Sequence, residues 1–518
     1  MRKRTVIYRG NLKSCNYTCS YCPFAKHRAL TAELEKDRRN FERFCDSVEM
    51  RVQDFSIGAV FVTPYGEASI HRWYWEGLSR LAELPGIDRV GMQTNLSFSV
   101  EECMEIFDSF RENDVSGGLF PEQKREKLCI WATFHPEMTT VDMFAAKCRR
   151  LAQNHVQVCA GAVGVPENIQ LIRELREKLS PAVYLWVNRM DGLKRNYRLD
   201  EISAFTEIDP FFTCELDYPE ADPSMCADRC FVEADGKVRS CNISRPKGAG
   251  WYESGEEEIF APACSGKRCT CYLSYGGRSD FTWKNIFGEY SVFRIPRKFK
   301  AVFFDLDGTL ISVRRGTGDI RGGLSERVRR RLTALGEICP IFLTTSMPEA
   351  DVKKHLRDDM ALFQGFVFAS GGYLCLKTET CRKEKIYPID INGLSEVIEE
   401  AMGSEKGIKA RCMAAEKSGT VYKVTLTKSH HGHWTDKECY RLEELLTGSD
   451  CRFFTENHCL EIVRKNCDKG TGIEEICGWL GISPEDTLAV GNDREDEAME
   501  RVCGGYIRME AILCYHAR

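Results

Sequence analysis

The run AVFFDLDGTL, residues 301–310, decides how the C-terminal half of this 518-residue chain folds. Four apolar residues lead into an Asp-x-Asp-Gly-Thr turn, which is the pattern of a buried strand that ends in a polar loop. Two carboxylates two residues apart at a strand end can share one divalent cation and one phosphoryl group. Asp305 is then placed to attack phosphorus and form an aspartyl phosphate, while Asp307 protonates the leaving group and later activates water. The run predicts an α/β fold that carries phosphoryl chemistry.

Three later segments extend this pattern: PIFLTTSMP, NCDKGTGI and LAVGNDREDEAM. In this order, and after DLDGT, they resemble the motifs of haloacid-dehalogenase-like (HAD) phosphatases. The resemblance implies that Thr345, or Thr344, hydrogen-bonds the phosphoryl oxygen. It implies that Lys469 neutralises the charge that develops during phosphoryl transfer, and that the last motif completes a magnesium site with Asp305 and Asp307.

The last motif departs from the family pattern G-D-x-x-N-D. Asn492 stands in the place of the first Asp, and Glu495 in the place of the Asn, whereas Asp493 and Asp496 remain acidic. Asn492 can still offer its carbonyl oxygen to the metal, and Asp496 can hold Lys469 or a metal-bound water. We expect a magnesium site that is weaker than usual.

More than a hundred residues separate the second motif from Lys469. The segment FASGGYLCLKTETC resembles the point at which the Cof-type branch of the family inserts its cap domain. We therefore expect a Rossmann-like core over residues 298–379 and 465–518, with an α+β cap of the C2 type over 380–464. The histidines of SHHGHW are interpreted as solvated loop residues: His430, His431 and His433.

The run SCNYTCSYC, residues 14–22, marks the N-terminal half. Cys15, Cys19 and Cys22 have the spacing C-x3-C-x2-C, so three thiolates can hold three irons of a [4Fe–4S] cube and leave the fourth iron open. A closed structural zinc site is the alternative, but it needs four ligands, and the next cysteine is Cys45.

This spacing, with Tyr21 before the last cysteine, resembles the signature of radical S-adenosylmethionine (SAM) enzymes. In that family the open iron binds SAM, and an electron from the cluster splits SAM to give a 5′-deoxyadenosyl radical that abstracts hydrogen from a substrate. The resemblance implies a partial (β/α)6 barrel over residues 1–205, a [4Fe–4S] cluster, SAM, and an electron donor such as flavodoxin or ferredoxin.

Strand-like and helix-like segments alternate after the cysteine loop, which independently predicts a parallel sheet with functional residues after the strands. The strand-like segments are FSIGAVFVTPYGEAS, DRVGMQTNLSF, KLCIWATFHPE, VQVCAGAVGVPE and AVYLWVNR. The helix-like segments between them are WYWEGLSRLAELPG, VEECMEIFDSF, VDMFAAKCRRLAQN and IQLIRELREKL.

The strand ends then fit the family resemblance. Gly66 and Glu67 take the place of the motif that meets the SAM amino group, although Tyr65 replaces its first glycine. Asn95, with Thr94, lies where a polar residue meets the SAM ribose. Val165, with Gly161 and Gly164, resembles the segment that packs the adenine, and His135 is a candidate to face SAM or the substrate.

A second group of cysteines spans residues 214–271, around FVEADGKVRSC, which predicts a hairpin with its turn at Asp235-Gly236. The arrangement resembles the SPASM or twitch extensions of radical SAM proteins, expected here over residues 206–295. The resemblance implies an auxiliary [4Fe–4S] cluster, and a structural zinc knot is the alternative. Its expected ligands are Cys226, Cys241, Cys264 and one or both of Cys269 and Cys271, but spacing does not separate these from Cys214 and Cys230.

Composition limits the remaining possibilities. The net charge of −5 argues against a nucleic-acid partner, and no apolar run approaches the roughly 20 residues of a membrane span. The 26 cysteines, without a signal peptide, indicate metal ligands and free thiols in a reducing cytoplasm.

We expect a bifunctional enzyme that combines radical chemistry on a small molecule or peptide with a phosphatase. One alternative is that the HAD-like half only docks a phosphorylated ligand. Another is that an active phosphatase is joined to an enzyme that modifies protein or nucleic acid.

Overall fold

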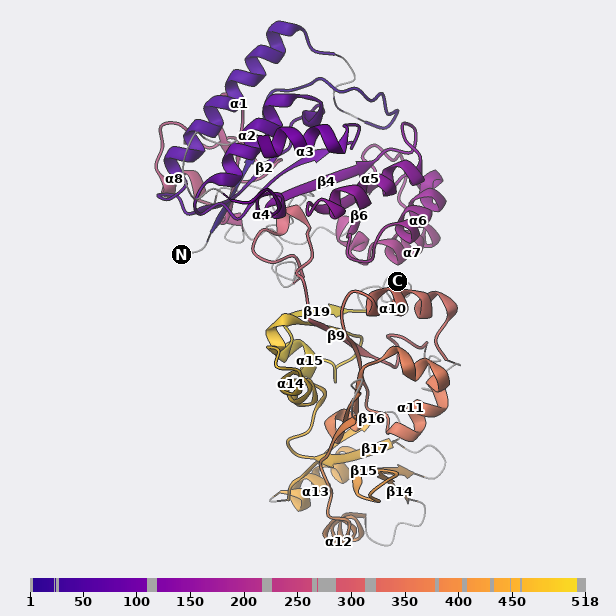
Figure 1. The fold of residues 1–518 in the computed structure, drawn as a ribbon. Coiled ribbons are helices and arrows are strands. Elements are labelled where there is room, and N and C mark those ends of the chain that lie inside the picture. Colours follow the sequence, from indigo (N-terminus) through magenta and orange to yellow (C-terminus); the bar gives the residue numbers. More distant parts are fainter. Residues whose placement is uncertain are drawn as a thin grey trace. The chain divides into compact units, whose positions relative to one another are not determined.

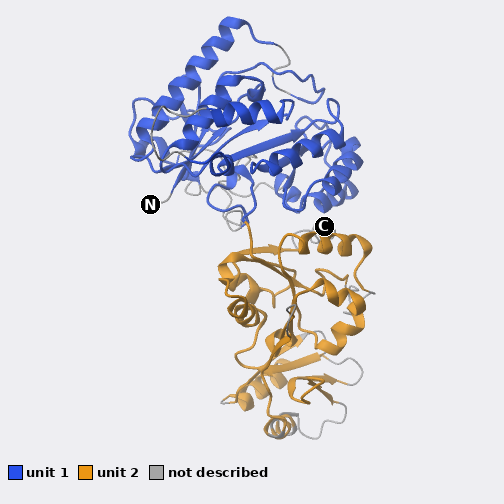
Figure 2. Cartoon of the chain, viewed as in Figure 1, with its two compact units in different colours: residues 1–297, 515–518 blue, residues 298–514 orange. Residues whose placement is uncertain are grey.

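The computed structural model divides into two compact units, residues 1–297 and 298–514 (Figure 2). The structure describes residues 3–22, 24, 28–109, 119–216, 226–262, 268, 286–312, 323–377, 382–402, 408–428, 433–447, 449–456 and 459–509. Among these residues, no helix combines the length and apolar character needed to cross a bilayer.

The N-terminal unit is built on one eight-stranded sheet, in the order β6-β5-β4-β3-β2-β1-β7-β8. The first six strands are parallel and lie in their sequence order, which confirms the predicted parallel sheet. The strands are β1 Arg4–Tyr8, β2 Ile57–Val62, β3 Arg89–Thr94, β4 Leu128–Phe134, β5 Gln157–Val163, β6 Leu185–Asn188, β7 Arg229–Val232 and β8 Val238–Arg239.

Helices connect these strands. They are α1 Thr31–Arg51, α2 Arg72–Glu83, α3 Val100–Ser109, α4 Pro121–Glu126, α5 Val141–Gln153, α6 Ile169–Lys178, α7 Leu199–Ile208 and α8 Glu256–Phe260, with 3₁₀ turns at Ala68–Ile70, Pro166–Asn168, Phe212–Glu215 and Ser291–Phe293. Figure 1 shows their order along the chain. The predicted helices correspond to α2, α3, α5 and α6, whereas α1, α4, α7 and α8 were not predicted.

Alternate residues of most strands contribute to two separate cores. Val6 and Tyr8 of β1 pack with the helices, whereas Ile7 between them packs with Trp131, Trp186 and Phe293 on the opposite face of the sheet. Both faces of the sheet are therefore buried, which explains why the strands read as nearly continuous apolar runs.

The predicted hairpin is present. Strands β7 and β8 pair antiparallel, and Gly236 in the turn has φ +86°, a conformation that favours glycine. Strand β7 also pairs parallel with β1, so this segment joins the main sheet.

The C-terminal unit contains a seven-stranded sheet in the order β13-β12-β11-β10-β9-β18-β19. Strands β9, β10, β11, β18 and β19 are parallel, and β12 and β13 are antiparallel to their neighbours. The strands are β9 Ala301–Asp305, β10 Ile341–Thr344, β11 Gly365–Phe368, β12 Tyr373–Lys377, β13 Arg382–Ile386, β18 Thr487–Gly491 and β19 Gly505–Arg508. The helices are α10 Glu326–Gly336, α11 Glu349–Leu356, α14 Lys469–Leu480 and α15 Glu497–Val502, with 3₁₀ turns at Arg357–Leu362, Ala369–Gly371 and Pro484–Asp486.

A smaller module is inserted between β13 and α14. It is a four-stranded antiparallel sheet, β14-β15-β17-β16, with two helices. Its elements are α12 Ile391–Met402, β14 Ile408–Ala414, β15 Val421–Lys428, α13 Asp436–Leu446, β16 Cys451–Glu456 and β17 Cys459–Arg464 (Figure 1). Strand β13, which falls in the range expected for the cap, instead pairs with β12 in the larger sheet. His433 is exposed, and His430 and His431 lie outside the described residues.

Two glycines of this unit provide a matched test of packing. Gly371 has φ +92°, and a Cβ added there would lie 2.5 Å from the carbonyl oxygen of Asp468, the residue that caps α14. Gly419 has φ +67° and nothing within 4 Å of an added Cβ.

We predict that Gly419→Ala lowers the free energy of unfolding by about 1 kcal/mol, the cost of backbone strain alone. Gly371→Ala should cost a further 1–3 kcal/mol or so, because the clash is with backbone. Urea unfolding followed by circular dichroism measures both, and equal losses would contradict the packing argument.

Candidate functional site

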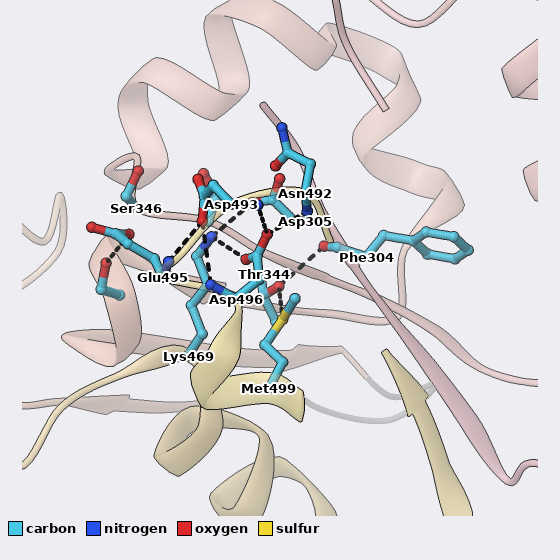
Figure 3. A network of polar contacts seen from close by, with 12 residues as sticks. Phe304, Asp305, Thr344, Ser346, Lys469, Asn492, Asp493, Glu495, Asp496 and Met499 are labelled. Carbon is cyan, nitrogen blue, oxygen red and sulfur yellow. Dashed lines mark hydrogen bonds and ion pairs between the residues drawn. The ribbon is translucent and has the colours of Figure 1, made fainter. Parts of the chain in front are cut away.

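Lys469 joins two carboxylates at the carboxyl end of the C-terminal sheet. Its Nζ lies 2.8 Å from Oδ1 of Asp305, which ends β9, and 2.7 Å from Oδ1 of Asp496, which precedes α15 (Figure 3). All three side chains are at most 3% exposed. One cation between two buried carboxylates relieves the repulsion that would otherwise separate β9 from α15.

Burial is the largest single influence on the pKa values of Asp305 and Lys469. It raises the pKa of Asp305 to about 7, an effect that Lys469 opposes and that the Asp496 carboxylate increases. Burial by itself would lower the pKa of Lys469, but the carboxylates of Asp305 and Asp496 raise it well above its usual value. Lys469 is therefore a permanent cation here.

The loop that follows β18 is held by its own carboxylates. Oδ2 of Asp496 accepts from the backbone N–H groups of Asn492, at 2.7 Å, and Asp493, at 3.1 Å. Oδ1 of Asp493 accepts from the N–H groups of Glu495 and Asp496. Both oxygens of Asp496 are thus used by Lys469 and the loop, so the structure shows the first of the two roles expected for this residue, holding Lys469.

The oxygen atoms that remain suit a hard cation. Oδ2 of Asp305 and Oδ1 of Asn492 are buried, and neither has a hydrogen-bond partner among the described residues. A Cβ on Gly308 would lie 1.9 Å from Nδ2 of Asn492, so only glycine lets this amide approach the DxDGT turn. Carboxylate and carbonyl oxygens are what Mg²⁺ prefers, and the residues present fit that ion. No three His, Cys, Asp or Glu side chains within the described ranges converge on one ion; here an amide replaces one carboxylate.

The two threonines after β10 point in different directions. The hydroxyl of Thr344 donates to the carbonyl of Phe304 at 3.2 Å and contacts the sulfur of Met499, so it faces the core (Figure 3). The side chain of Thr345 accepts instead from the N–H of Met347. This geometry favours Thr345 over Thr344 as the residue available to a phosphoryl group.

A buried lysine of the inserted module, not anticipated from the sequence, reaches the same loop. Lys423 on β15 is 2% exposed, and its Nζ donates to the carbonyl of Ser346 at 2.6 Å and to Glu461 on β17. Ser346 directly follows Thr345. The inserted module therefore contacts the loop after β10.

Comparison with known proteins agrees with this geometry. Residues 409–510 match the family model for haloacid dehalogenase-like hydrolases. This match supports the expected HAD character of the C-terminal half, and it includes Lys469 and the loop 492–496.

Solved structures similar to this part of the chain include a sugar phosphatase of HAD subclass IIB, with 19% identity over 42% of this chain and 91% of that chain, at a TM-score of 0.30. A haloacid dehalogenase-like hydrolase from Bacteroides thetaiotaomicron has 17% identity over 42% and 92%, at a TM-score of 0.32. One from B. subtilis has 13% identity over 41% and 92%, also at 0.32.

The N-terminal unit has a cavity at the carboxyl ends of its parallel strands. Among the predicted residues, its lining includes Cys15, Cys19, Cys22, Tyr21, Gly66, Glu67, Asn95 and His135. Val165 is not in the lining, and Gly161, Ala162 and Val163 of β5 take its place. The lining residues that sequence reasoning missed include Arg9, Gln93, Thr133, Trp186 and Asn188.

The loop after β2 holds the cysteine loop through backbone contacts. Gly66 N–H donates to Leu12 and Glu67 N–H donates to Ser14, both at 2.8 Å. A Cβ on Gly66 would lie 2.1 Å from the Ser14 carbonyl oxygen, so glycine is required here. The first role of Gly66 is therefore to let these two loops meet.

Polar side chains connect the same loops. The carboxylate of Glu67 is buried and accepts from Ser69, from the hydroxyl of Thr94 at 2.7 Å and from the N–H of Asn95 at 2.7 Å. The amide of Asn95 donates to Asn16 in the cysteine loop at 3.0 Å. Glu67 and Asn95 thus shape the cavity wall.

The thiols of Cys15, Cys19 and Cys22 lie close enough for their charges to affect one another's pKa values. Burial raises the pKa of Cys19 to about 11, and the neighbouring Cys22 and Cys15 raise it further. Burial also raises the pKa of Cys15. Three thiols on one loop are the donor type that an iron–sulfur cluster uses, but in this structure no three His, Cys, Asp or Glu side chains of the described residues, these cysteines included, meet at one metal position.

His135 and Tyr21 form a pair on the cavity wall. The Tyr21 hydroxyl lies 2.9 Å from Nδ1 of His135. Burial lowers the pKa of His135 to about 4, so the ring is neutral at pH 7.

The second group of cysteines is only partly described. Cys226 is half-buried, and Cys241 is buried beside Phe231 and Tyr290. Cys230 is fully buried in the core that faces the helices, where burial raises its pKa to about 12. This position separates Cys230 from the expected ligands. Cys264, Cys269 and Cys271 lie outside the described residues.

A buried charge cluster lies next to the cavity. The guanidinium of Arg294 stacks 3.5 Å from the ring centroid of Trp186, whose Nε1 donates to Glu215 at 3.1 Å. Burial raises the pKa of Glu215 to about 8 and that of Asp209 to about 6, and Arg294 opposes both shifts.

These raised values predict a pH-dependent stability. The folded protein keeps the Glu215 proton to a higher pH than the unfolded chain does, so stability is lost as the pH rises toward 8. Between pH 5 and pH 8 we expect the free energy of unfolding to fall by on the order of 2–5 kcal/mol. Glu215→Gln should remove most of this slope, because Asp209 alone remains.

Urea unfolding followed by tryptophan fluorescence measures the slope, since six of the eight tryptophans lie in residues 1–297. Parallel pH profiles for wild type and Glu215→Gln would show that the carboxyl is not protonated in the folded protein.

Proposed function

We propose that the C-terminal unit is a magnesium-dependent phosphatase. Asp305 attacks phosphorus and forms an aspartyl phosphate, while Asp307 donates a proton to the oxygen of the leaving group. Asp307 then takes a proton from a water that attacks the same phosphorus, which breaks the bond to Asp305, releases inorganic phosphate and restores the Asp305 carboxylate. Thr345 hydrogen-bonds the phosphoryl oxygens, and Lys469 balances their charge while Asp496 holds it. The observation that carries this proposal is the ammonium of Lys469 bridging Asp305 and Asp496.

Asp305, Asp307 and Asn492 would hold the magnesium ion, whereas both oxygens of Asp496 already accept from Lys469 and the loop. When bound, Mg²⁺ supplies positive charge that neutralises the phosphoryl oxygens. The substrate class that we propose is a phosphorylated metabolite.

Asp305→Asn should reduce phosphate release by roughly 10³-fold or more, because the amide is a poor nucleophile. The assay is phosphate release with magnesium over sugar phosphates, nucleotides and p-nitrophenyl phosphate. Asp486→Asn, which removes a surface carboxylate paired with Lys300, is the control and should keep full activity. Binding of phosphorylated compounds without release from any of them would favour the docking module instead.

We further propose that the N-terminal unit is a radical SAM enzyme. Cys15, Cys19 and Cys22 would hold a [4Fe–4S] cluster, and Tyr21, Gly66, Glu67, Asn95 and the β5 end near Val165 would surround SAM. When loaded, the cluster supplies the electron that splits SAM. Three thiols, an acid and an amide on one cavity wall at the ends of parallel strands support this proposal.

An auxiliary [4Fe–4S] cluster on Cys226, Cys241, Cys264, Cys269 and Cys271 belongs to the same proposal, as does a flavodoxin or ferredoxin as electron donor. The substrate is a small molecule or a peptide in the cytoplasm. Because both sites are in one chain, the product of one site is released at a high effective concentration near the other site.

Cys19→Ala should lower iron content from about eight atoms per chain to about four, if two [4Fe–4S] clusters are present. It should abolish SAM cleavage and leave phosphate release intact. Cys412→Ala, at an exposed thiol, is the matched control. Zinc without sulfide in the purified protein, or SAM cleavage by Cys19→Ala, would overturn the radical assignment.

A further inference from the structure

Arg9 is a buried cation on the wall of the N-terminal cavity. It directly follows β1 and is 8% exposed. Its Nη1 donates to the carbonyl of Thr63 at 2.8 Å and lies 3.4 Å from the Thr63 hydroxyl oxygen, and its Nη2 donates to the amide oxygen of Asn242. Its guanidinium carbon lies 4.7 Å from the ring centroid of Tyr65. All of these partners are neutral.

The other buried arginines of the described chain have acidic neighbours. Arg229 lies 2.8 Å from the carboxylate of Asp228. Arg294 feels the charges of Glu215 and Asp209. Arg9 forms no ion pair with a carboxylate of any residue that the structure describes. A buried charge without an opposite charge is costly, so this position calls for an anion.

The acids on the same cavity wall are already engaged. Glu67 accepts from Ser69, Thr94 and Asn95. Asp191 lies 3.7 Å from Arg189, the other arginine in the lining. Among the described residues, the carboxylates of the wall therefore do not supply an anion to Arg9.

The surroundings of Arg9 hold its guanidinium in place. The hydroxyl of Thr63 donates to Gln93 at 2.8 Å, so its oxygen is left to accept from Arg9. Gln93, Thr133 and the buried Trp186 line the same cavity. A fixed guanidinium next to amide, hydroxyl and aromatic groups suits an organic molecule with one anionic end.

We infer that Arg9 binds the carboxylate or phosphate of the substrate in the N-terminal cavity. Guanidinium binds either oxyanion through two parallel hydrogen bonds. The inference deepens the proposed radical function by naming the substrate class, and rests on this cavity being its active site. Anion binding is measured without radical chemistry, so the two can fail separately.

The test uses the full chain carrying Asp305→Asn, so that the C-terminal site is the same in every variant. Calorimetric titrations with inorganic phosphate, pyrophosphate and succinate compare this parent protein with its Arg9→Gln and Arg9→Lys variants. We expect Arg9→Gln to weaken binding of at least one of these anions by roughly 10- to 100-fold, the worth of a charge-assisted hydrogen bond. Arg9→Lys should bind more tightly than Arg9→Gln but less tightly than the parent, because it keeps the charge and loses the second parallel hydrogen bond.

Arg80→Gln is the matched control, since it removes an arginine of the same unit that pairs with Asp46 and Glu49 away from the cavity. It should bind all three anions like the parent. A role for Arg9 in folding alone would affect Arg9→Lys and Arg9→Gln equally, without a selective loss of anion binding. Unchanged binding in Arg9→Gln, or no binding in the parent, overturns the inference.

A second measurement separates the substrate from SAM and from the cluster. The iron content and the SAM dissociation constant are measured on anaerobically reconstituted protein. Both should agree within about threefold between the parent and its Arg9→Gln variant, a difference smaller than the effect of one charged hydrogen bond. A tenfold loss of SAM affinity, or a loss of iron, with anion binding intact would assign the charge to SAM or the cluster and overturn the inference. Failure of the radical proposal alone would appear as absent SAM cleavage with Arg9-dependent anion binding retained.

Discussion

The ammonium of Lys469 is the contact on which the C-terminal unit depends. Asp305 ends one strand, Lys469 begins a helix and Asp496 precedes another helix, so one side chain fixes three elements from distant parts of the chain. Because all three are buried, the pair of carboxylates is tolerable only while the cation lies between them. Asp496 in turn holds the loop that carries Asn492. The positions of the oxygens proposed to bind a metal therefore depend on the ion pairs of this one buried lysine.

Both candidate sites lie where parallel strands end. In the N-terminal unit, β1 to β6 bring the cysteine loop, Glu67, Asn95 and His135 to one cavity, although they are spread over more than a hundred residues. The order of the strands brings these loops to one end of the sheet, and glycines let neighbouring loops pack closely. Gly66 lets two loops touch in the first unit, and Gly308 does the same in the second.

Sequence patterns predicted the features that depend on local order. Alternating apolar and polar segments predicted the parallel sheet, and short motifs predicted Asp305, Lys469 and the cysteine loop. Helix α1 was missed because charged residues dominate it, although Phe41, Phe44, Cys45 and Val48 have the spacing of a buried helical face. Arg9 and Lys423 were missed because their significance lies in partners that are far away in the chain. No local pattern reveals that Arg9 has no carboxylate partner among the described residues, or that Lys423 reaches Ser346.

Asn492 stands where the family pattern has Asp, and this difference alters the charge balance of the proposed phosphoryl site. Lys469 already neutralises part of the charge of Asp305 and Asp496, so the oxygens left for a cation carry less negative charge than a second carboxylate would provide. A divalent ion is then held less strongly by the protein alone. A phosphate group brings its own negative oxygens to the same place, and these add to the attraction for the ion. Metal and phosphorylated ligand should therefore stabilise each other's binding, by the same amount in both directions.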